Sequence, residues 1–306
     1  MATTKNKSTK AKPKTTKPVL RSQGKNSATK ATKTTKKSVS VKAVKTTTAQ
    51  KVKKPYTFQL QRLNLASGLL AIILAATAGF LMNDSTYQIF TGLLTADELA
   101  SKTSAIFIPA VHSVFDLELR WAVVFILLVS AIIPLLAATK KRKQFEDSLE
   151  KNVMLWRWID MAVVSALIVE VIALLSGVRD LMTLKFIGAF MVITCVLGWF
   201  AEKQNANSAK PERNNFYLSL ITGSLPWIMI AVYALGTLLW GQVRSPWYVY
   251  VLYITTLAAF TGYVGNQSWL RKAKQSYEVT ERNYILLSIF VKVAFAVILI
   301  IGLYKK

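Results

Sequence analysis

Seven long apolar runs constrain this chain more than any other feature of its sequence. Each run has about 20 residues or more and few charges, which is the length that an α-helix needs to cross a bilayer. The runs occupy residues 63–82, 117–138, 156–176, 181–201, 216–240, 247–270 and 284–304. Hydrophobic residues make up 53% of the chain, and its mean hydropathy is +0.36. The sequence therefore predicts an all-α membrane protein, a bundle of seven transmembrane helices.

The first 54 residues have a different composition. They hold 17 Lys or Arg and no acidic residue, whereas the other 252 residues carry a net charge of only +7, so most of the formal charge of +24 belongs to this tail. A Lys-, Thr- and Ala-rich segment with so few apolar residues is expected to be disordered. We predict a disordered basic tail, residues 1–54, and a transmembrane domain, residues 55–306. The tail lacks a signal-peptide core; it is interpreted as a topogenic tail, or alternatively as one that contacts anionic lipid or nucleic acid.

Two connecting segments are unusual. The segment after the first run, residues 83–115, is too long for a plain connection between helices and contains an apolar patch at residues 105–111. We expect it to fold against the bundle or against a second subunit. The stretch before the third run, Phe145–Leu155, is amphipathic and can extend that helix.

The distribution of Lys and Arg predicts the orientation of the bundle. With the amino terminus inside, the inner loops hold 12 Lys or Arg besides the tail, and the outer segments hold seven. The inner set is Lys140, Lys141, Arg142, Lys143, Lys151, Lys203, Lys210, Arg213, Arg271, Lys272, Lys274 and Arg282. The positive-inside rule therefore predicts a multi-pass cell-membrane protein with a cytoplasmic amino terminus and an external carboxyl terminus.

Lys292 is the one charged residue in the seventh run, Tyr284–Tyr304, which is 21 residues long. It lies eight residues after Tyr284, or about 12 Å along a helix. A charge at such a depth costs at least about 2.5 kcal/mol, so a functional site with a partner is expected. A lysine amine can also condense with an aldehyde to form a Schiff base. In this setting the candidate aldehyde is retinal.

A buried Lys292 needs a counter-charge nearby. The candidate carboxylates are Asp160 and Glu170 in the third run and Glu118 at the outer end of the second. If the third helix begins near Lys151, Asp160 lies about 13 Å into it, level with Lys292, whereas Glu170 lies about 15 Å further outward. Asp160 is therefore the predicted counterion.

Three further residues are site candidates. Ser288 precedes Lys292 by one helical turn and can hydrogen-bond the Schiff base or Asp160, although its own helix backbone is an equal alternative. Aromatic residues at helical spacing, such as Trp227 and Phe260, are more often part of the bundle core than of a ligand pocket, so these two do not decide the function. On these residues alone, the Lys–Asp pair also fits a transporter coupling site or a structural ion pair.

The sequence resembles the heliorhodopsin family over all seven runs. The resemblance rests on a few motifs. They are Tyr284–Lys292 in the seventh run, Arg157–Asp160 in the third, Gly198-Trp199 with Glu202, Gly223–Ile228, Tyr248–Tyr250 and Phe260. The inverted topology predicted above is also a trait of that family.

The resemblance implies a rhodopsin-like fold that binds all-trans retinal on Lys292. It further implies Asp160 as counterion, Ser288 as its hydrogen-bond partner, and Trp227 and Phe260 as retinal neighbours. A homodimer, a slow light-driven cycle and usually no ion pumping are also implied. Two departures are visible: the family generally has glutamate at the position of Asp160, and Ala71 and Pro134 stand where family members often carry histidines in an inner polar cavity.

Light-driven motion of a Schiff base relative to Asp160 would act as a packing switch. We expect a photosensory receptor or a light-dependent regulator of a cytoplasmic signalling partner. Light-driven proton transport is the alternative, but the sequence predicts no carboxylate deeper than the loops on the inner side, and only Glu170 and Glu118 on the outer side. A third hypothesis is a membrane tether with a nucleic-acid-binding tail. The sequence shows no motif that indicates an enzyme.

Overall fold

The computed structural model describes residues 54–96, 107–206, 208, 212–241, 244–271 and 276–304, so the predicted basic tail lies outside the described residues except for Lys54. The helices are α1 (Lys54–Leu81), α2 (Leu119–Ala138), α3 (Arg142–Glu150), α4 (Leu155–Leu175), α5 (Leu181–Asn205), α6 (Asn214–Trp240), α7 (Trp247–Arg271) and α8 (Tyr277–Gly302). The strands are β1 (Thr86–Ala96) and β2 (Phe107–Glu118).

The prediction of a seven-helix bundle is confirmed. Within the described ranges, all helices except α3 are long and apolar enough to cross a membrane. Two of them begin several residues before their apolar runs, because polar residues form their first turns. α1 begins at Lys54 rather than Leu63, and α8 begins at Tyr277 rather than Tyr284. These two early starts add several polar positions to the bundle.

The long segment after the first helix forms a β-hairpin, which the sequence analysis did not predict. β1 and β2 pair antiparallel from Thr86↔Glu118 to Ala96↔Phe107, with an irregularity after Ile89. Aromatic and β-branched residues at the start of β1 favour an extended strand. Ile89 is buried against the bundle, and the Phe90 N–H donates to the Arg179 carbonyl between α4 and α5 at 3.1 Å. The base of the hairpin is thus attached to the helices.

The amphipathic stretch before α4 does not extend that helix. It forms the separate helix α3, whose Phe145 and Leu149 are buried. The turn that follows contains Asn152 in a left-handed conformation, with φ of 54°, which asparagine tolerates better than most residues. The chain therefore reverses before α4 begins at Leu155.

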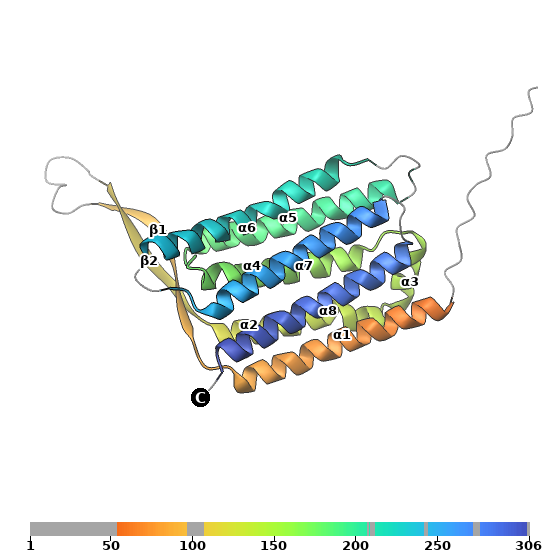
Figure 1. Ribbon diagram of the computed structural model, residues 1–306, viewed down its shortest axis with the longest axis horizontal. Helices are drawn as coiled ribbons and strands as arrows, with labels where there is room; N and C mark the ends of the chain where they lie inside the picture. Colours follow the sequence, from red (N-terminus) through yellow and green to blue (C-terminus); the bar gives the residue numbers. More distant parts are fainter. Residues whose placement is uncertain are drawn as a thin grey trace, which may run out of the picture. The chain divides into compact units, whose positions relative to one another are not determined.

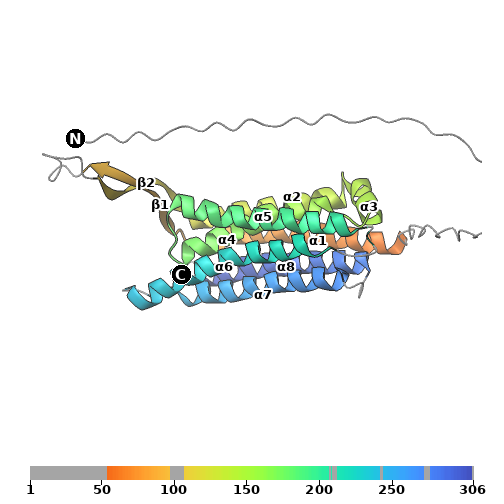
Figure 2. The same ribbon diagram turned by 90° about the horizontal axis from the view of Figure 1, so that it is seen from above.

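The helices lie side by side, with α1 packed against α2 and α8, α4 against α5, and α7 against α8 (Figure 1). One end of the bundle carries the hairpin and the carboxyl terminus, and we call it the hairpin end (Figure 1). The opposite end carries α3 and the starts of α4, α6 and α8, and we call it the α3 end (Figure 2).

Candidate functional site

Lys292 of α8 is buried, with only 2% of its surface exposed. Its Nζ donates a hydrogen bond to the Ser130 carbonyl of α2 at 2.8 Å and another to Ser67 Oγ of α1 at 3.3 Å. α8 packs against both α1 and α2, so these partners are supplied by its neighbours. The amine is thus held inside the bundle by two hydrogen bonds to neutral groups.

Asp160 of α4 lines the same cavity as Lys292. Its Oδ1 is buried and has no hydrogen-bond partner among the described residues. No Asp160–Lys292 ion pair within 4.0 Å occurs among those residues either. The two side chains are therefore neighbours across a cavity, and Asp160 retains an unused acceptor.

The helix starts from which the depths of these two residues were predicted differ from those in the structure, but both residues line one cavity. Asp160 lies only five residues into α4, which begins at Leu155, and Lys292 lies 15 residues into α8, which begins at Tyr277. The third helix was expected to begin near Lys151 and the last apolar run begins at Tyr284. Counted from the observed starts, the two residues lie at different distances along their helices, yet they line the same cavity.

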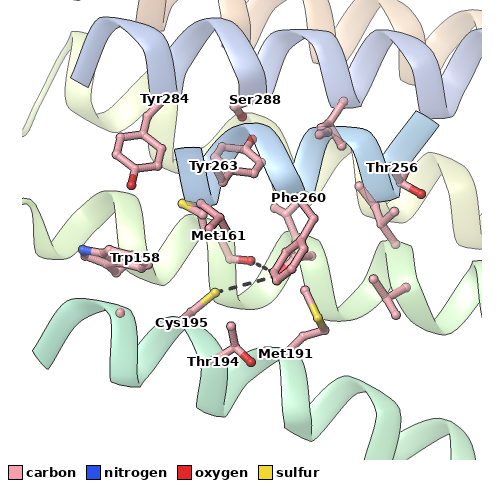
Figure 3. Close-up of a pocket in the computed structure, with 18 of the residues that line it drawn as sticks. Trp158, Met161, Met191, Thr194, Cys195, Thr256, Phe260, Tyr263, Tyr284 and Ser288 are labelled. Carbon is pink, nitrogen blue, oxygen red and sulfur yellow. Dashed lines mark hydrogen bonds between the residues drawn. The ribbon is translucent and has the colours of Figure 1, made fainter. Parts of the chain in front are cut away.

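The main cavity is enclosed by α4, α5, α6, α7 and α8, and all five predicted site residues line it: Lys292, Asp160, Ser288, Trp227 and Phe260. Its other lining residues are mostly apolar or aromatic. Those on α4 and α5 include Trp158, Met161, Val164, Ile168, Val169, Met191, Thr194 and Cys195. Figure 3 shows Tyr263 and Phe260 of α7 on the side of the cavity opposite Met191 and Cys195.

An aromatic group forms the wall between α6 and α7. The Trp227 ring lies 6.1 Å from the Phe260 ring and 5.6 Å from the Tyr253 ring, measured between centroids. The Tyr253 hydroxyl also donates to the Trp227 carbonyl at 2.9 Å. At Gly223 a Cβ would lie only 2.8 Å from Phe260 Cζ, so the glycine lets this ring approach the α6 backbone. Trp227 and Phe260 are therefore fixed by their neighbours while lining the cavity.

A second, more polar space lies on the other side of Asp160, and we call it the side chamber. Its lining comes from α1, α2, α3, α4 and α8. The lining residues are Asn64, Ser67, Ile133, Pro134, Ala137, Phe145, Trp156, Arg157, Asp160, Met161, Glu281, Tyr284, Ile285 and Ser288. Asp160, Met161, Tyr284 and Ser288 line both spaces, so they form the boundary between them. Pro134 lines the chamber and Ala71 does not.

A buried ionic cluster at the α3 end was missed by the sequence analysis, which placed no inner carboxylate deeper than the loops. Arg157 of α4 forms ion pairs with Glu202 of α5 and Glu281 of α8. The exposed fractions of these residues are 8%, 3% and 2%, respectively. The expectation was wrong because α5 continues past Ala201 and α8 begins before Tyr284, so both carboxylates belong to helices.

Glu202 is the most heavily hydrogen-bonded member of this cluster. Besides Arg157, it accepts from the Met154 N–H at 2.8 Å, Trp158 Nε1 at 2.7 Å and the Tyr277 hydroxyl at 2.5 Å. The sequence singled out Glu202 only as part of a family motif. Glu281 had a usable signal, since it precedes Lys292 by 11 residues, which places both on one face of a helix.

The other two predicted carboxylates lie away from the cavity. Glu170 pairs with Lys185 at 2.8 Å, and Glu118 is an exposed residue at the start of α2. Neither lines the main cavity. The structure therefore leaves Asp160 as the carboxylate of that space.

The residues of the main cavity fit retinal. An elongated polyene needs an apolar cavity with aromatic walls, and five helices supply one. A covalent bond to the protein needs a reactive amine, which Lys292 offers in the same cavity. A cationic nitrogen at that amine would need an acceptor, and Asp160 Oδ1 is buried and unused.

The comparisons with known proteins agree with this fit. The family described as Heliorhodopsin matches residues 60–303. The fold is similar to the crystal structure of the transmembrane domain of Salpingoeca rosetta rhodopsin phosphodiesterase, with a TM-score of 0.54 and 12% identity over 81% of this chain and 84% of that one. At this identity the likeness concerns the fold alone. A search of curated proteins gave no match. The family match covers most of the sequence, so this chain belongs to the heliorhodopsins, a family of retinal-binding, light-sensing rhodopsins.

Proposed function

We propose that this protein is a photosensory receptor or a light-dependent regulator that does not pump ions. In this proposal Lys292 carries all-trans retinal as a protonated Schiff base, and Asp160 is its counterion. The observation that carries the proposal is the pairing of a buried amine with a buried, unpartnered carboxylate oxygen in one apolar cavity. Bound retinal supplies light absorption and a change of shape.

We propose that the residues around Lys292 and Asp160 position the bound group. Ser288 lies one turn before Lys292 and lines both spaces, so it can hydrogen-bond the lysine nitrogen or Asp160. Trp227 and Phe260 hold the far wall of the cavity through contacts with each other. A shift of charge at Lys292 changes its interaction with Asp160, and α4 and α8 must adjust to it. This adjustment is the proposed signal to a cytoplasmic partner.

The α3 end is proposed to face the cytoplasm. The excess of Lys and Arg in the loops at this end supports that orientation. The family is generally non-enzymatic, and we propose that this chain is not an enzyme. A signalling partner would then bind at the α3 end.

We also propose a homodimer, in which the hairpin contributes to the contact. β2 is exposed at nearly every position. Its side chains include large apolar ones, with Phe107 64% and Val111 69% exposed, and Leu94 of β1 is 71% exposed. Exposed apolar surface of this kind favours association. Cross-linking in a native membrane should give a dimer, and Val111→Lys should weaken it.

Light-driven proton transport is the second candidate. It is favoured by Glu202 and Glu281, which place buried carboxylates on the α3 side of Lys292. A light-induced pH change in a suspension of cells that express the protein, abolished by a protonophore, would establish transport. If light changes the absorption spectrum of the protein but not the pH of the suspension, the sensory function is supported.

The first test is the visible absorption spectrum of the protein expressed with all-trans retinal. The wild type should show a visible band that hydroxylamine bleaches, and Lys292→Ala should lose it entirely. Lys185→Ala is the matched control, because Lys185 also lies in a transmembrane helix but pairs with Glu170 outside the cavity. This control should keep the band. A band that persists in Lys292→Ala would refute the Schiff base.

A further inference from the structure

The charges buried at the α3 end do not balance. Arg157 is one cation beside two carboxyl groups, Glu202 and Glu281, and all three are buried. The other charged residues that line the two adjoining spaces, Asp160 and Lys292, have opposite charges. An unpaired carboxylate in a low-dielectric interior is costly and takes up a proton instead. The remaining titratable neighbours, Tyr277 and Tyr284, are neutral as phenols, so one of the two glutamates should carry a proton.

The hydrogen bonds identify which glutamate stays ionised. Glu202 accepts bonds from four donors, namely Arg157, Trp158, Tyr277 and the Met154 backbone. Donors that point at a carboxylate stabilise its charged form. Glu281 accepts only one bond, from Arg157 to its Oε2, among the residues that the structure describes. The proton therefore belongs on Glu281.

The side chamber offers Glu281 a polar space through which its proton can exchange. It lines the side chamber, and Asn64 Nδ2, Arg157 Nε and Asp160 Oδ1 are buried atoms of other chamber residues that lack a partner within the described ranges. Buried polar atoms of this kind are commonly bridged by water. Ser67, which bonds the Lys292 amine, lines the same chamber. Glu281 and Ser67, the hydrogen-bond partner of Lys292, thus line one polar space.

We propose that Glu281 is the proton-binding group of the α3 side, protonated in the resting protein and in exchange with the side chamber. Glu202 is its permanently ionised counterpart and Arg157 bridges the two. This site is separate from the Lys292–Asp160 pair and does not require retinal. It supplies a buried exchangeable proton on the side of Lys292 where the sequence had suggested none.

Infrared spectroscopy of the purified full chain, with and without retinal, tests the assignment. A protonated carboxyl group gives a carbonyl stretch distinct from that of a carboxylate. We expect Glu281→Asp to shift one such band, Glu202→Asp to leave it in place, and transfer to D₂O to shift it in the wild type. The proposal would be overturned if the band shifted in Glu202→Asp or if no band changed in Glu281→Asp. It would also be overturned if D₂O left the band of the wild type unchanged.

Thermal stability gives a second readout that does not depend on band assignment. Glutamine resembles a protonated glutamate in shape and charge, so Glu281→Gln should change the melting temperature very little. Glu202→Gln removes an ionised group with four donors and should lower it on the order of 5 °C. Equal losses in the two variants would contradict the proposal. A missing visible band would refute the retinal function alone, because both measurements also apply to the retinal-free protein.

Discussion

The two ends of the bundle use the same charged residue types in opposite ways. At the hairpin end, Arg120 pairs with Asp84 at 2.6 Å and Lys185 pairs with Glu170 at 2.8 Å, but Asp84 and Lys185 have 55% and 60% of their side chains exposed. At the α3 end, the side chain of Arg157 is 7% exposed, and those of its two partners are 2% exposed. Each pair of the first group thus has one member at the surface, whereas the second group is buried throughout.

This difference implies different roles for the two ends. Exposed pairs contribute little to stability because water solvates each member when the pair is broken. Removing a charged member of a buried cluster costs much more, since its oppositely charged partner remains buried and unpaired. The α3 end should therefore be sensitive to loss of the Arg157 or Glu202 charge, whereas the hairpin end should tolerate loss of a single charge.

Arg157→Gln should produce the largest effect of this kind. It leaves Glu202 and Glu281 buried without their common cation, and we expect a loss of about 3–5 kcal/mol in the free energy of unfolding. Denaturant unfolding in mixed micelles measures it. Arg120→Gln is the control at the hairpin end and should cost less than about 1 kcal/mol. Similar losses in the two variants would remove the contrast between the ends.

Gly198→Ala tests the packing that surrounds the cluster. A Cβ at this position would lie 2.5 Å from the Trp158 ring, whose Nε1 donates to Glu202. Overpacking of this kind costs about 1–3 kcal/mol. Gly265→Ala of α7 is the matched control, because a Cβ there meets nothing within 4 Å. We expect a lower melting temperature for Gly198→Ala only. A lower melting temperature for both variants would mean that any glycine-to-alanine change in these helices destabilises the protein, and contact with Trp158 would not be the cause.

Much of the bundle and of the cavity was predictable from sequence for a physical reason. Apolar runs of this length have one stable environment, and a charge within such a run, such as Lys292 or Asp160, is conspicuous because its burial is costly. Ser288 follows from helical spacing alone. Trp227 and Phe260 came from the family resemblance, since aromatic residues at helical spacing are more often part of a plain core.

The parts that were missed depend on long-range contacts. Arg157 pairs with residues 45 and 124 positions away, and charges near the end of an apolar run look like loop charges when the run is read alone. The hairpin was missed because β2 is exposed at nearly every position and shows no alternation of apolar and polar residues. Neither feature leaves a local periodic signal.

Asp180 shows how a charge at the hairpin end is satisfied without an ion pair. It caps α5, and hydrogen bonds from the Thr183 N–H and hydroxyl, both 2.7 Å long, lower the pKa of its carboxyl group. Because the pKa is lowered in the folded protein, the stabilisation is present above the unfolded value near 3.9 and is lost as the pH falls through the folded value.

Asp180→Ala should therefore cost about 1 kcal/mol at neutral pH, and this difference should shrink below about pH 4. Melting temperatures of the two proteins across that pH range measure it. Asp180→Asn keeps a capping oxygen without a charge and should show a smaller loss at neutral pH. A difference between wild type and Asp180→Ala that grows on acidification would contradict the assigned sign.

Lys185→Ala should have the smallest effect of these substitutions, despite its short contact with Glu170. The carboxylate keeps access to solvent after the change, since 18% of its side chain is exposed and the lysine that covers it is mostly in the open. We expect a loss of no more than about 0.5 kcal/mol, reduced further by added salt. A double-mutant cycle of Lys185→Ala and Glu170→Gln, measured by denaturant unfolding at low and high salt, gives the coupling free energy of the pair. A coupling above about 2 kcal/mol that salt leaves unchanged would mean that this pair is desolvated like the cluster around Arg157, and burial would then no longer distinguish the two ends of the bundle.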